Sequence, residues 1–592
     1  MNLKIGIPLR LGHLPVVMDF LRRSHLFHII DRAVREDPRS KVSTSECVAV
    51  LLCSIFSGAH DLWRVRERLA LFDMKTIMQD PGFDLDEFPE ERLAKALDNL
   101  QAANLDKMMT AIAVQVIEQF DLNTEFLGFD TTSLSFYGAY EEEGFGGMLP
   151  TQMKSRKPEP HVTYGYSKNH RGDLKQILYG TLMSTDGIPL WGKALDGNQV
   201  DSISAAHFFS QVHDIVADPR SVCCVADSKG WCARVLKVVL ADGMRLLSRL
   251  PRTNGLHSQL MQKPWKPTQT YTVPGRRKDD DPDVYSFMAF DLDQDFSLVT
   301  PSADPQGAPL KESFSVPVRA LRIHSTALMR TKVKTLKRTR VRERIAAKKA
   351  LTTWQSHGYT SEDDALRAAE QLSQNHGWGT LNLRAVPRRV TGPIKRGRGR
   401  PSKRSAPPLE GAHYRLDLSL VAVGKKTLDA RLHAQSSYIL IRTRSKGWKI
   451  SDSELIPRYK GLYHNEHGFA WLKSGANLNP IFLHTPQRIG SLSFVYCLGL
   501  MTWNLIQRAV RTNLVKNNTG LPYHRGKLSN RITTRFLFYL FNQVQMVPYT
   551  LADGTAQRSL VGLEQHPTEA CKALGCNPKI YEPVSEIPNG KK

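Results

Sequence analysis

The spacing of apolar and polar positions divides the chain near residue 118. Residues 1–118 carry apolar side chains at the helical period. Ser43-Thr-Ser-Glu46 has the form of a capping box before the apolar run Val48–Phe56. Basic and apolar residues continue at helical spacing through Asp61–Phe72. This part of the chain is therefore predicted to be an N-terminal helical domain.

From residue 119 the pattern changes to short apolar runs separated by turn residues, which is typical of strands. Two runs flank Thr185-Asp-Gly187, which predicts a hairpin. Residues 119–251 hold predicted strands at Glu125–Phe136, Leu174–Met183, Ile188–Leu195, Val222–Ala226 and Met244–Leu250, and helices at Ser202–Val216 and Cys232–Ala241. Three strands followed by helix, strand, helix and strand predict a mixed sheet with a helical crossover, and hence an α/β fold.

Residues 252–435 are predicted to interrupt this core as a mixed, basic insertion. Its elements are strands at Phe314–His324 and Tyr414–Val423, helices at 327–354 and 361–375, and an Arg/Gly/Pro linker at Arg388–Pro408. Strand character returns at Ser437–Thr443. Residues 436–515 are therefore expected to complete the core, and residues 516–592 to form a C-terminal tail region.

The longest apolar run of the chain is Leu492–Ile506. It is too short, and too interrupted by polar residues, to span a bilayer, so it predicts a buried helix. Met1–Arg10 lacks the apolar core of a signal peptide. No membrane partner is expected.

The chain is strongly basic, with 81 Lys and Arg against 57 Asp and Glu and a net charge of +24 over 592 residues. The excess is clustered. Residues 330–349 hold ten Lys or Arg and one acid, and residues 395–404 hold six and no acid. This clustering favours a polyanionic partner such as nucleic acid; the alternative is a general contribution to solubility.

The eight cysteines form no C-x2-C pair and several lie in apolar runs. We interpret them as reduced core thiols, which disfavours a zinc site and indicates a cytoplasmic protein.

Two acids lie in or next to predicted strands. Asp130 is surrounded by the apolar residues of Phe126-Leu-Gly-Phe-Asp130, and Asp227 ends the run Val222-Cys-Cys-Val-Ala. An ionised carboxylate in an apolar strand is rare without a partner, and the carboxyl ends of strands are where α/β sheets place ligand groups. The alternatives are a solvent-facing Asp130 and an Asp227 that caps the next helix.

A third acid lies in the stretch Tyr459–Lys473. Interpreted as one helix, this stretch places Tyr459, Leu462, Glu466, Phe469 and Lys473 on one face. A carboxylate on a mostly apolar face is costly unless it is paired or holds a metal, although Glu466 as a surface residue near Lys473 is the alternative.

Asp130, Asp227 and Glu466 together predict a carboxylate cluster beside an α/β sheet. Such a cluster suits oxygen-preferring divalent cations, above all Mg²⁺, with Mn²⁺ as a substitute. Two ions roughly 4 Å apart activate a hydroxyl nucleophile and stabilise the leaving oxygen in phosphoryl transfer.

These residues resemble the DDE transposases of bacterial insertion sequences. One subgroup carries a large insertion between the second Asp and the Glu, and has the motif Tyr-x2-Arg-x3-Glu-x6-Lys. Tyr459, Glu466 and Lys473 match this motif in register, with Leu462 in place of the Arg. Gly165–Gln176 and Gly197–Asp201 also resemble the subgroup, and the likeness extends over about residues 10–580.

The resemblance implies a ribonuclease H-like catalytic core in which Asp130, Asp227 and Glu466 are the metal-binding catalytic residues. Tyr459 and Lys473 would then hold phosphates of the transposon end. Three further cations, Lys168, Arg171 and Lys175, are expected to line the same groove or to form a solvated basic edge.

The basic segment 395–404 contains Gly399-Arg400-Pro401, which is similar to the core of an AT-hook. Arg398 and Arg400 are therefore candidates for insertion into an A·T minor groove, with a flexible basic linker as the alternative. The helix at about 327–354 is a candidate for phosphate contacts, or else a solvated basic face.

The expected function is cleavage of the terminal inverted repeats and strand transfer into target DNA. The resemblance implies double-stranded DNA as partner, a homodimer in the synaptic complex, and a cytoplasmic, nucleoid-associated location. The basic and apolar residues at helical spacing in Asp61–Phe72 make DNA-end binding or dimerisation, or else plain helical packing, the expected role of residues 1–118. The rival functions are a structure-selective nuclease of the same fold and a DNA-binding transposase derivative without catalysis.

Overall fold

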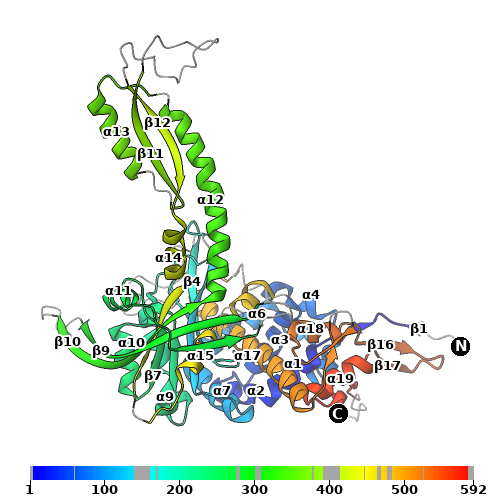
Figure 1. The fold of residues 1–592 in the computed structure, drawn as a ribbon. Helices are drawn as coiled ribbons and strands as arrows, with labels where there is room; N and C mark the ends of the chain where they lie inside the picture. The colour runs from blue at the N-terminus through cyan, green and yellow to red at the C-terminus, as the bar shows by residue number, and fades with distance from the viewer. Residues whose placement is uncertain are drawn as a thin grey trace, which may run out of the picture. The chain divides into compact units, whose positions relative to one another are not determined.

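The chain folds into two compact units of mixed α and β structure (Figure 1). The computed structural model describes residues 4–58, 61–138, 140, 160–168, 171–274, 281–300, 309–355, 357–375, 379–390, 414–445, 447–462, 468–475, 483–523 and 526–584. The first unit comprises Met1–Pro251, Leu292–Arg319 and Ile441–Lys592, and the second comprises Arg252–Asp291 and Ala320–Leu440. Leu292–Arg319, which the sequence placed in the insertion, thus belongs to the first unit.

The first unit opens with helices, as the apolar period predicted. They are α1 (Leu14–Arg23), α2 (Leu26–Ala33), α3 (Thr44–Phe56), α4 (Val65–Leu69), α5 (Met74–Met78), α6 (Glu90–Ala102) and α7 (Leu105–Gln119). The capping box before α3 is confirmed, because the Ser43 side chain accepts from the Glu46 N–H and the Glu46 carboxylate accepts from the Ser43 N–H. Two short strands, β1 (Lys4–Ile5) and β2 (Leu9–Arg10), precede the helices.

A mixed sheet of nine strands, in the order β5-β4-β3-β6-β7-β13-β10-β9-β8, follows. The first five lie wholly in the first unit: β3 (Phe126–Phe136), β4 (Lys175–Ser184), β5 (Pro189–Leu195), β6 (Cys223–Ala226) and β7 (Arg245–Arg249). β3, β4 and β5 are antiparallel neighbours, whereas β6 runs parallel to β3 and β7 parallel to β6. The predicted mixed sheet is confirmed, with the hairpin turn at Gly187, which has a φ of 78°.

Helices α8 (Asp201–Ser210), α9 (Val212–Ile215) and α10 (Ala233–Ala241) occupy the predicted crossover positions. Phe208 of α8 packs tightly onto β4: a Cβ atom at Gly180 would lie 2.6 Å from its ring. The neighbouring Tyr179 points to the opposite face, where its hydroxyl donates to the Ser493 carbonyl of α17 (Pro486–Lys516) at 3.2 Å. The sheet is therefore buried on both faces at these strands.

Helix α17 has 31 residues and extends beyond the predicted apolar run at both ends. By length and composition it is apolar enough to cross a membrane, and it is the one such helix in the described part of the chain. However, 83% of its most apolar window is buried against the rest of the protein. This burial is what the core helix of a folded domain shows, in agreement with the predicted buried helix.

The C-terminal region returns to the start of the chain. Its elements are β14 (Leu521–Pro522), β15 (Leu528–Ser529), α18 (Thr534–Leu540), β16 (Gln545–Thr550), β17 (Ala556–Val561) and α19 (Gln565–Leu574). β16 pairs antiparallel with both β1 and β2, and the Tyr581 hydroxyl donates to the Gly12 carbonyl at 2.9 Å. The two ends of the chain are thus tied together, which the sequence did not predict.

The second unit contains most of the insertion. Its elements are α11 (Gly255–Gln262), β8 (Gln269–Val273), α12 (Thr326–Gln355), α13 (Glu362–Asn375), β11 (Leu381–Arg389), β12 (Tyr414–Ala422) and α14 (Lys425–Gln435). The strands β9 (Asp283–Thr300), β10 (Leu310–Ser325) and β13 (Ser437–Thr443) have residues in both units. β9, β8 and β11 were not predicted. β11 and β12 form an antiparallel ribbon that packs on α13 through a small core of Ala365, Ala369 and Leu416.

Candidate active site

Two neighbouring parallel strands bring Asp130 and Asp227 together. Phe126 of β3 pairs with Cys223 of β6, and Gly128 pairs with Val225. Asp130 lies four residues after Phe126 and Asp227 four residues after Cys223, so the two acids share one register position. Side chains at equal positions of adjacent parallel strands point to the same face. The predicted pairing of these carboxylates is therefore supported by the strand register.

Asp130 lies within β3, and its side chain is only 28% exposed. Its Oδ1 accepts the Thr131 N–H at 2.7 Å and the Lys168 ammonium at 3.3 Å. Burial raises the pKa of Asp130, Lys168 opposes that shift, and the nearby charge of Asp227 adds to it. The ionised form is thus destabilised by burial and by a like charge, which positive charge at this position relieves.

Asp227 follows the last residue of β6 and is exposed. Its Oδ1 accepts the Lys229 N–H at 2.9 Å and caps the short 3-10 turn Ser228–Gly230. Asp227 therefore caps this 3-10 turn and not helix α10, whose N-cap is Cys232. The capping bond occupies one oxygen of the carboxylate. Among the described residues, no hydrogen bond reaches the second oxygen of Asp227 or of Asp130.

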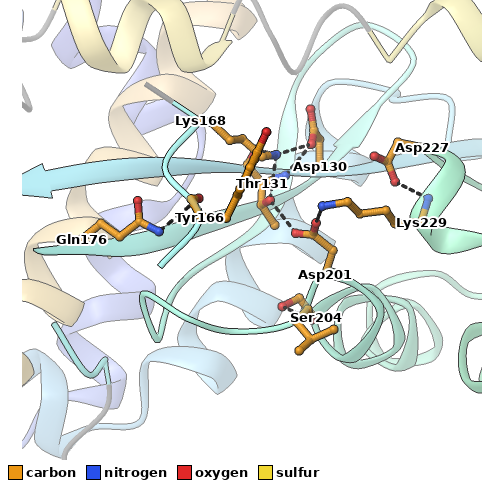
Figure 2. A network of polar contacts seen from close by, with 10 residues as sticks. Asp130, Thr131, Tyr166, Lys168, Gln176, Asp201, Ser204, Asp227 and Lys229 are labelled. Atoms are coloured by element: carbon orange, nitrogen blue, oxygen red, sulfur yellow. Dashed lines mark hydrogen bonds and ion pairs between the residues drawn. The ribbon is translucent and has the colours of Figure 1, made fainter. Parts of the chain in front are cut away.

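A network of polar contacts links the two acids (Figure 2). Lys168 donates to the Thr131 carbonyl and to its hydroxyl, the latter at 3.0 Å. Thr131 in turn contacts Asp201, with 3.3 Å between Oγ1 and Oδ1. Asp201 forms an ion pair with Lys229, whose backbone N–H donates to the Asp227 carboxylate. The chain of contacts therefore runs from Asp130 to Asp227 through Thr131, Asp201 and Lys229.

Asp201 and Lys229 were not predicted as site residues. Asp201 begins α8. No local pattern in the sequence relates it to its partner Lys229, because 28 residues separate the two. The available signal was weak: an acid at the start of a predicted helix, and a Lys two residues after Asp227. The pairing raises the pKa of Lys229, which keeps its ammonium charged.

Tyr459 is within electrostatic range of both aspartates. It occupies the last turn of α15 (Asp452–Lys460). Burial raises its pKa to about 12, Arg249 opposes the shift, and the charges of Asp227 and Asp130 add to it. The Tyr459 hydroxyl is therefore neutral at physiological pH, and the charges of both carboxylates contribute to this.

Lys473 is within electrostatic range of Lys168, the cation that contacts Asp130. It lies in a π-helical turn, Trp471–Gly475, a geometry that often marks functional sites. Burial lowers its pKa to about 8, and the neighbouring charge of Lys168 lowers it further. Lys168 also contacts Asp130. Lys168 therefore interacts both with Lys473, through its charge, and with one of the aspartates.

The predicted single helix from Tyr459 to Lys473 is wrong at its start. α15 ends at Lys460, with Gly461 as its C-cap and a turn that includes Leu462. Gly is a frequent helix terminator, and Pro457 already interrupts the hydrogen-bond ladder of α15. The face-spacing argument therefore does not relate Tyr459 to Lys473.

Three predicted site residues, Glu466, Arg398 and Arg400, lie outside the described residues. Two others have contacts of their own. Arg171 forms an exposed ion pair with Asp173 at 2.8 Å. Lys175 donates to the Tyr140 carbonyl at 2.8 Å and lies near the Tyr164 ring. Of the three cations predicted to line the groove, Lys168 is the one in contact with Asp130.

The donor set fits a divalent cation that prefers oxygen. Asp130 and Asp227 each offer a carboxylate oxygen, and their mutual repulsion is the electrostatic condition that such a cation relieves. Within the described ranges no group of three His, Cys, Asp or Glu residues is assembled for a metal. The third predicted ligand, Glu466, falls in the segment 463–467 that those ranges leave out.

The N-terminal helices match a known family model. The family model of a domain of unknown function, DUF4277, matches residues 8–114. No curated protein matches the chain. The matched residues cover α1 to most of α7 and end before β3, so they do not include the aspartates.

Proposed function

We propose that this chain is a DDE transposase that cleaves the terminal inverted repeats of its element and joins the freed ends to target DNA. The observation that carries the proposal is the equal register of Asp130 and Asp227 on parallel neighbours β3 and β6. Three antiparallel strands continued by two parallel ones support the ribonuclease H-like core that the resemblance implies. The proximity of Tyr459 and Lys168 to the aspartates supports a phosphate-binding site there.

In this proposal Asp130 and Asp227 hold Mg²⁺ or Mn²⁺, with Glu466 as the third ligand. A bound divalent cation supplies Lewis-acid stabilisation of the reacting phosphate and a more acidic nucleophile. The protein contributes the carboxylates: Asp130 is held within β3, and Asp227 directly after β6 by the turn that it caps. Tyr459 offers a neutral hydroxyl donor, and Lys473 and Lys168 offer ammonium groups for non-bridging phosphate oxygens.

The reaction needs no further co-reactant. In cleavage, a water oxygen bonds to phosphorus and the 3′-oxygen of the transposon strand leaves, taking a proton. In strand transfer, that 3′-hydroxyl attacks a target phosphodiester and displaces another 3′-oxygen. Both steps are phosphoryl transfers that one carboxylate site can serve in succession.

The test is a cleavage and strand-transfer assay on duplexes carrying the inverted repeats that flank the gene. We expect Mg²⁺-dependent nicking at the repeat end and joining to a target plasmid. Asp130→Asn and Asp227→Asn should abolish both, whereas the matched control Asp186→Asn, in an ion pair with Arg508, should retain them. Wild-type activity of both site variants would overturn the proposal, and cleavage without joining would indicate a nuclease.

A further inference from the structure

Helix α12 (Thr326–Gln355) belongs to the second unit and is labelled in Figure 1. Its sequence carries a dense run of positive charge. Nine Lys or Arg residues lie between Lys332 and Lys349, against a single acid, Glu343. Among the described residues, none of these nine cations forms a salt bridge. The helix therefore carries uncompensated charge along about five turns.

Glu343 is occupied by the fold. Its carboxylate accepts the Gly379 N–H at 2.7 Å and the Thr380 N–H at 2.9 Å, and it also accepts the Thr380 hydroxyl. These contacts fasten α12 to the start of β11. Ala347, one turn further along the same side, is fully buried. The acid thus lies on the packed side of α12 and does not neutralise the opposite side.

The opposite side forms a continuous exposed stripe. At 3.6 residues per turn its members fall within an arc of about 120° centred roughly opposite Glu343 and Ala347. The stripe consists of Lys334, Arg338, Val341, Arg342, Ile345, Lys348 and Lys349, all exposed. Val341 is 60% and Ile345 67% exposed.

We propose that this stripe of α12 binds the phosphate backbone of double-stranded DNA. From Lys334 to Lys349 it extends about 22 Å, and duplex DNA presents one negative charge per about 1.7 Å, so all five cations can meet phosphates at once. The charge complementarity requires a polyanion. The choice of DNA as that polyanion rests on the proposed function.

A protein partner fits the stripe poorly. Stable interfaces bury about 800 Å² on each side, and their centres are depleted of Lys. Here two apolar side chains are surrounded by five cations. Phosphate contacts carry no sequence information, so the stripe would hold DNA in position and leave sequence recognition to other residues.

The experiment measures the affinity of the full-length protein for a duplex of arbitrary sequence, in EDTA, across a range of salt concentrations. The variant replaces Lys334, Arg338, Arg342, Lys348 and Lys349 by Gln, which keeps helix propensity. The matched control makes the same five-charge change at exposed positions outside α12 and outside residues 1–118: Lys516, Lys527, Arg531, Lys572 and Lys579. Circular dichroism verifies that both variants fold.

Each phosphate contact contributes about 0.9 to the slope of log affinity against log salt. We expect the α12 variant to lower the slope by about 2 or more and to weaken binding at least about tenfold at moderate salt. The control should keep the wild-type slope, because charges farther than about 10 Å from the DNA are screened.

An unchanged slope in the α12 variant would overturn the inference, as would an equal fall in the control or tighter binding of duplex RNA than of DNA. The result is independent of catalysis. If the α12 variant lowers the salt slope but the wild-type protein never cleaves DNA, the proposed function is wrong and the α12 DNA-binding surface stands. If the α12 variant still cleaves DNA and its salt slope is unchanged, the proposed function stands and the α12 surface is wrong.

Discussion

Asp130 and Asp227 stand at the same register position of two neighbouring parallel strands, each four residues beyond a paired residue. Because β6 ends at Ala226, Asp227 is free of the sheet ladder, while Asp130 remains inside β3. One acid is thus half-buried with a raised pKa, and the other is exposed and caps a turn. In the proposed metal site, such an asymmetric pair would provide a rigid ligand and a more solvated one.

Asp201 is expected to act by positioning this pair. Asp201→Asn removes the partner of Lys229 and weakens the contact with Thr131. We predict about a tenfold rise in the Mg²⁺ concentration needed for half-maximal cleavage, as is typical when a residue behind a metal ligand is lost. DNA affinity in EDTA should not change.

The ion pair supplies its own coupling test. Lys229→Gln alone should resemble Asp201→Asn, and the double variant should be little worse than either, since the two residues act through one contact. Asp106→Asn is the matched control. Asp106 forms an ion pair with Lys193, with 2.8 Å between Oδ2 and Nζ, and this pair does not involve β6. Additive effects of the two site substitutions would argue against a shared network.

Lys473 predicts a pH dependence of DNA binding. Its pKa is lowered to about 8, so the ammonium is lost as the pH rises from 7 to 9. Affinity for transposon-end DNA should fall several-fold over this interval in the wild type. Lys473→Arg keeps its charge at both values and should lose much less. Parallel pH profiles for the two proteins would exclude this role for Lys473.

The lowered pKa of Lys473 also predicts that the stability of the fold rises with pH, whereas DNA affinity falls. Between about pH 8 and the ordinary lysine pKa of 10.5, the folded protein has released the Lys473 proton and the unfolded chain still holds it. The free energy of unfolding contributed by this group therefore rises with pH across that window. Denaturant titrations of the wild type and Lys473→Met at pH 7.5 and 10 would measure the difference.

His13 predicts acid sensitivity of the first unit. It stacks on Phe538 with ring centroids 3.9 Å apart, and a ring nitrogen lies 3.1 Å from the Phe56 carbonyl. Burial lowers its pKa from 6.5 to about 4. The unfolded chain thus binds a proton first as the pH falls from 6.5 to 4, and stability is lost across that range.

His13→Gln should remove much of this loss, which is roughly 2 to 3 kcal/mol from the size of the pKa shift. Urea titrations at pH 7 and 4.5 check it, with the exposed His213→Gln as control. Equal acid destabilisation of wild type and His13→Gln would show that other groups cause it.

Local patterns predicted most of the elements around the site. β3, β4, β5, β6, β7, α8 and α10 all fall where apolar period and turn residues placed them, and the positions of Asp130 and Asp227 in or next to strands follow directly. Burial on both faces, by α8 at Gly180 and α17 at Tyr179, explains why these strands have nearly continuous apolar runs.

What the sequence missed are contacts between distant residues and a local break. The Asp201–Lys229 pair and the pairing of β16 with β1 and β2 join segments that no local pattern relates. The break after Lys460 was missed because apolar spacing outweighed Pro457 and Gly461, the residues that end α15. The strand β9 alternates acids with apolar residues, and that charge obscured its strand pattern.

The most direct test of the metal site is a change of metal preference at Asp227. In Asp227→Cys a thiolate replaces the carboxylate, and a thiolate is a poor ligand for Mg²⁺ and a better one for Mn²⁺. We predict that this variant does not cleave inverted-repeat DNA with Mg²⁺ and regains at least about tenfold activity with Mn²⁺, whereas Asp227→Ser stays inactive with both. Wild-type cleavage by Asp227→Cys in Mg²⁺, or equal revival of Asp227→Ser by Mn²⁺, would contradict a carboxylate–metal contact at this position.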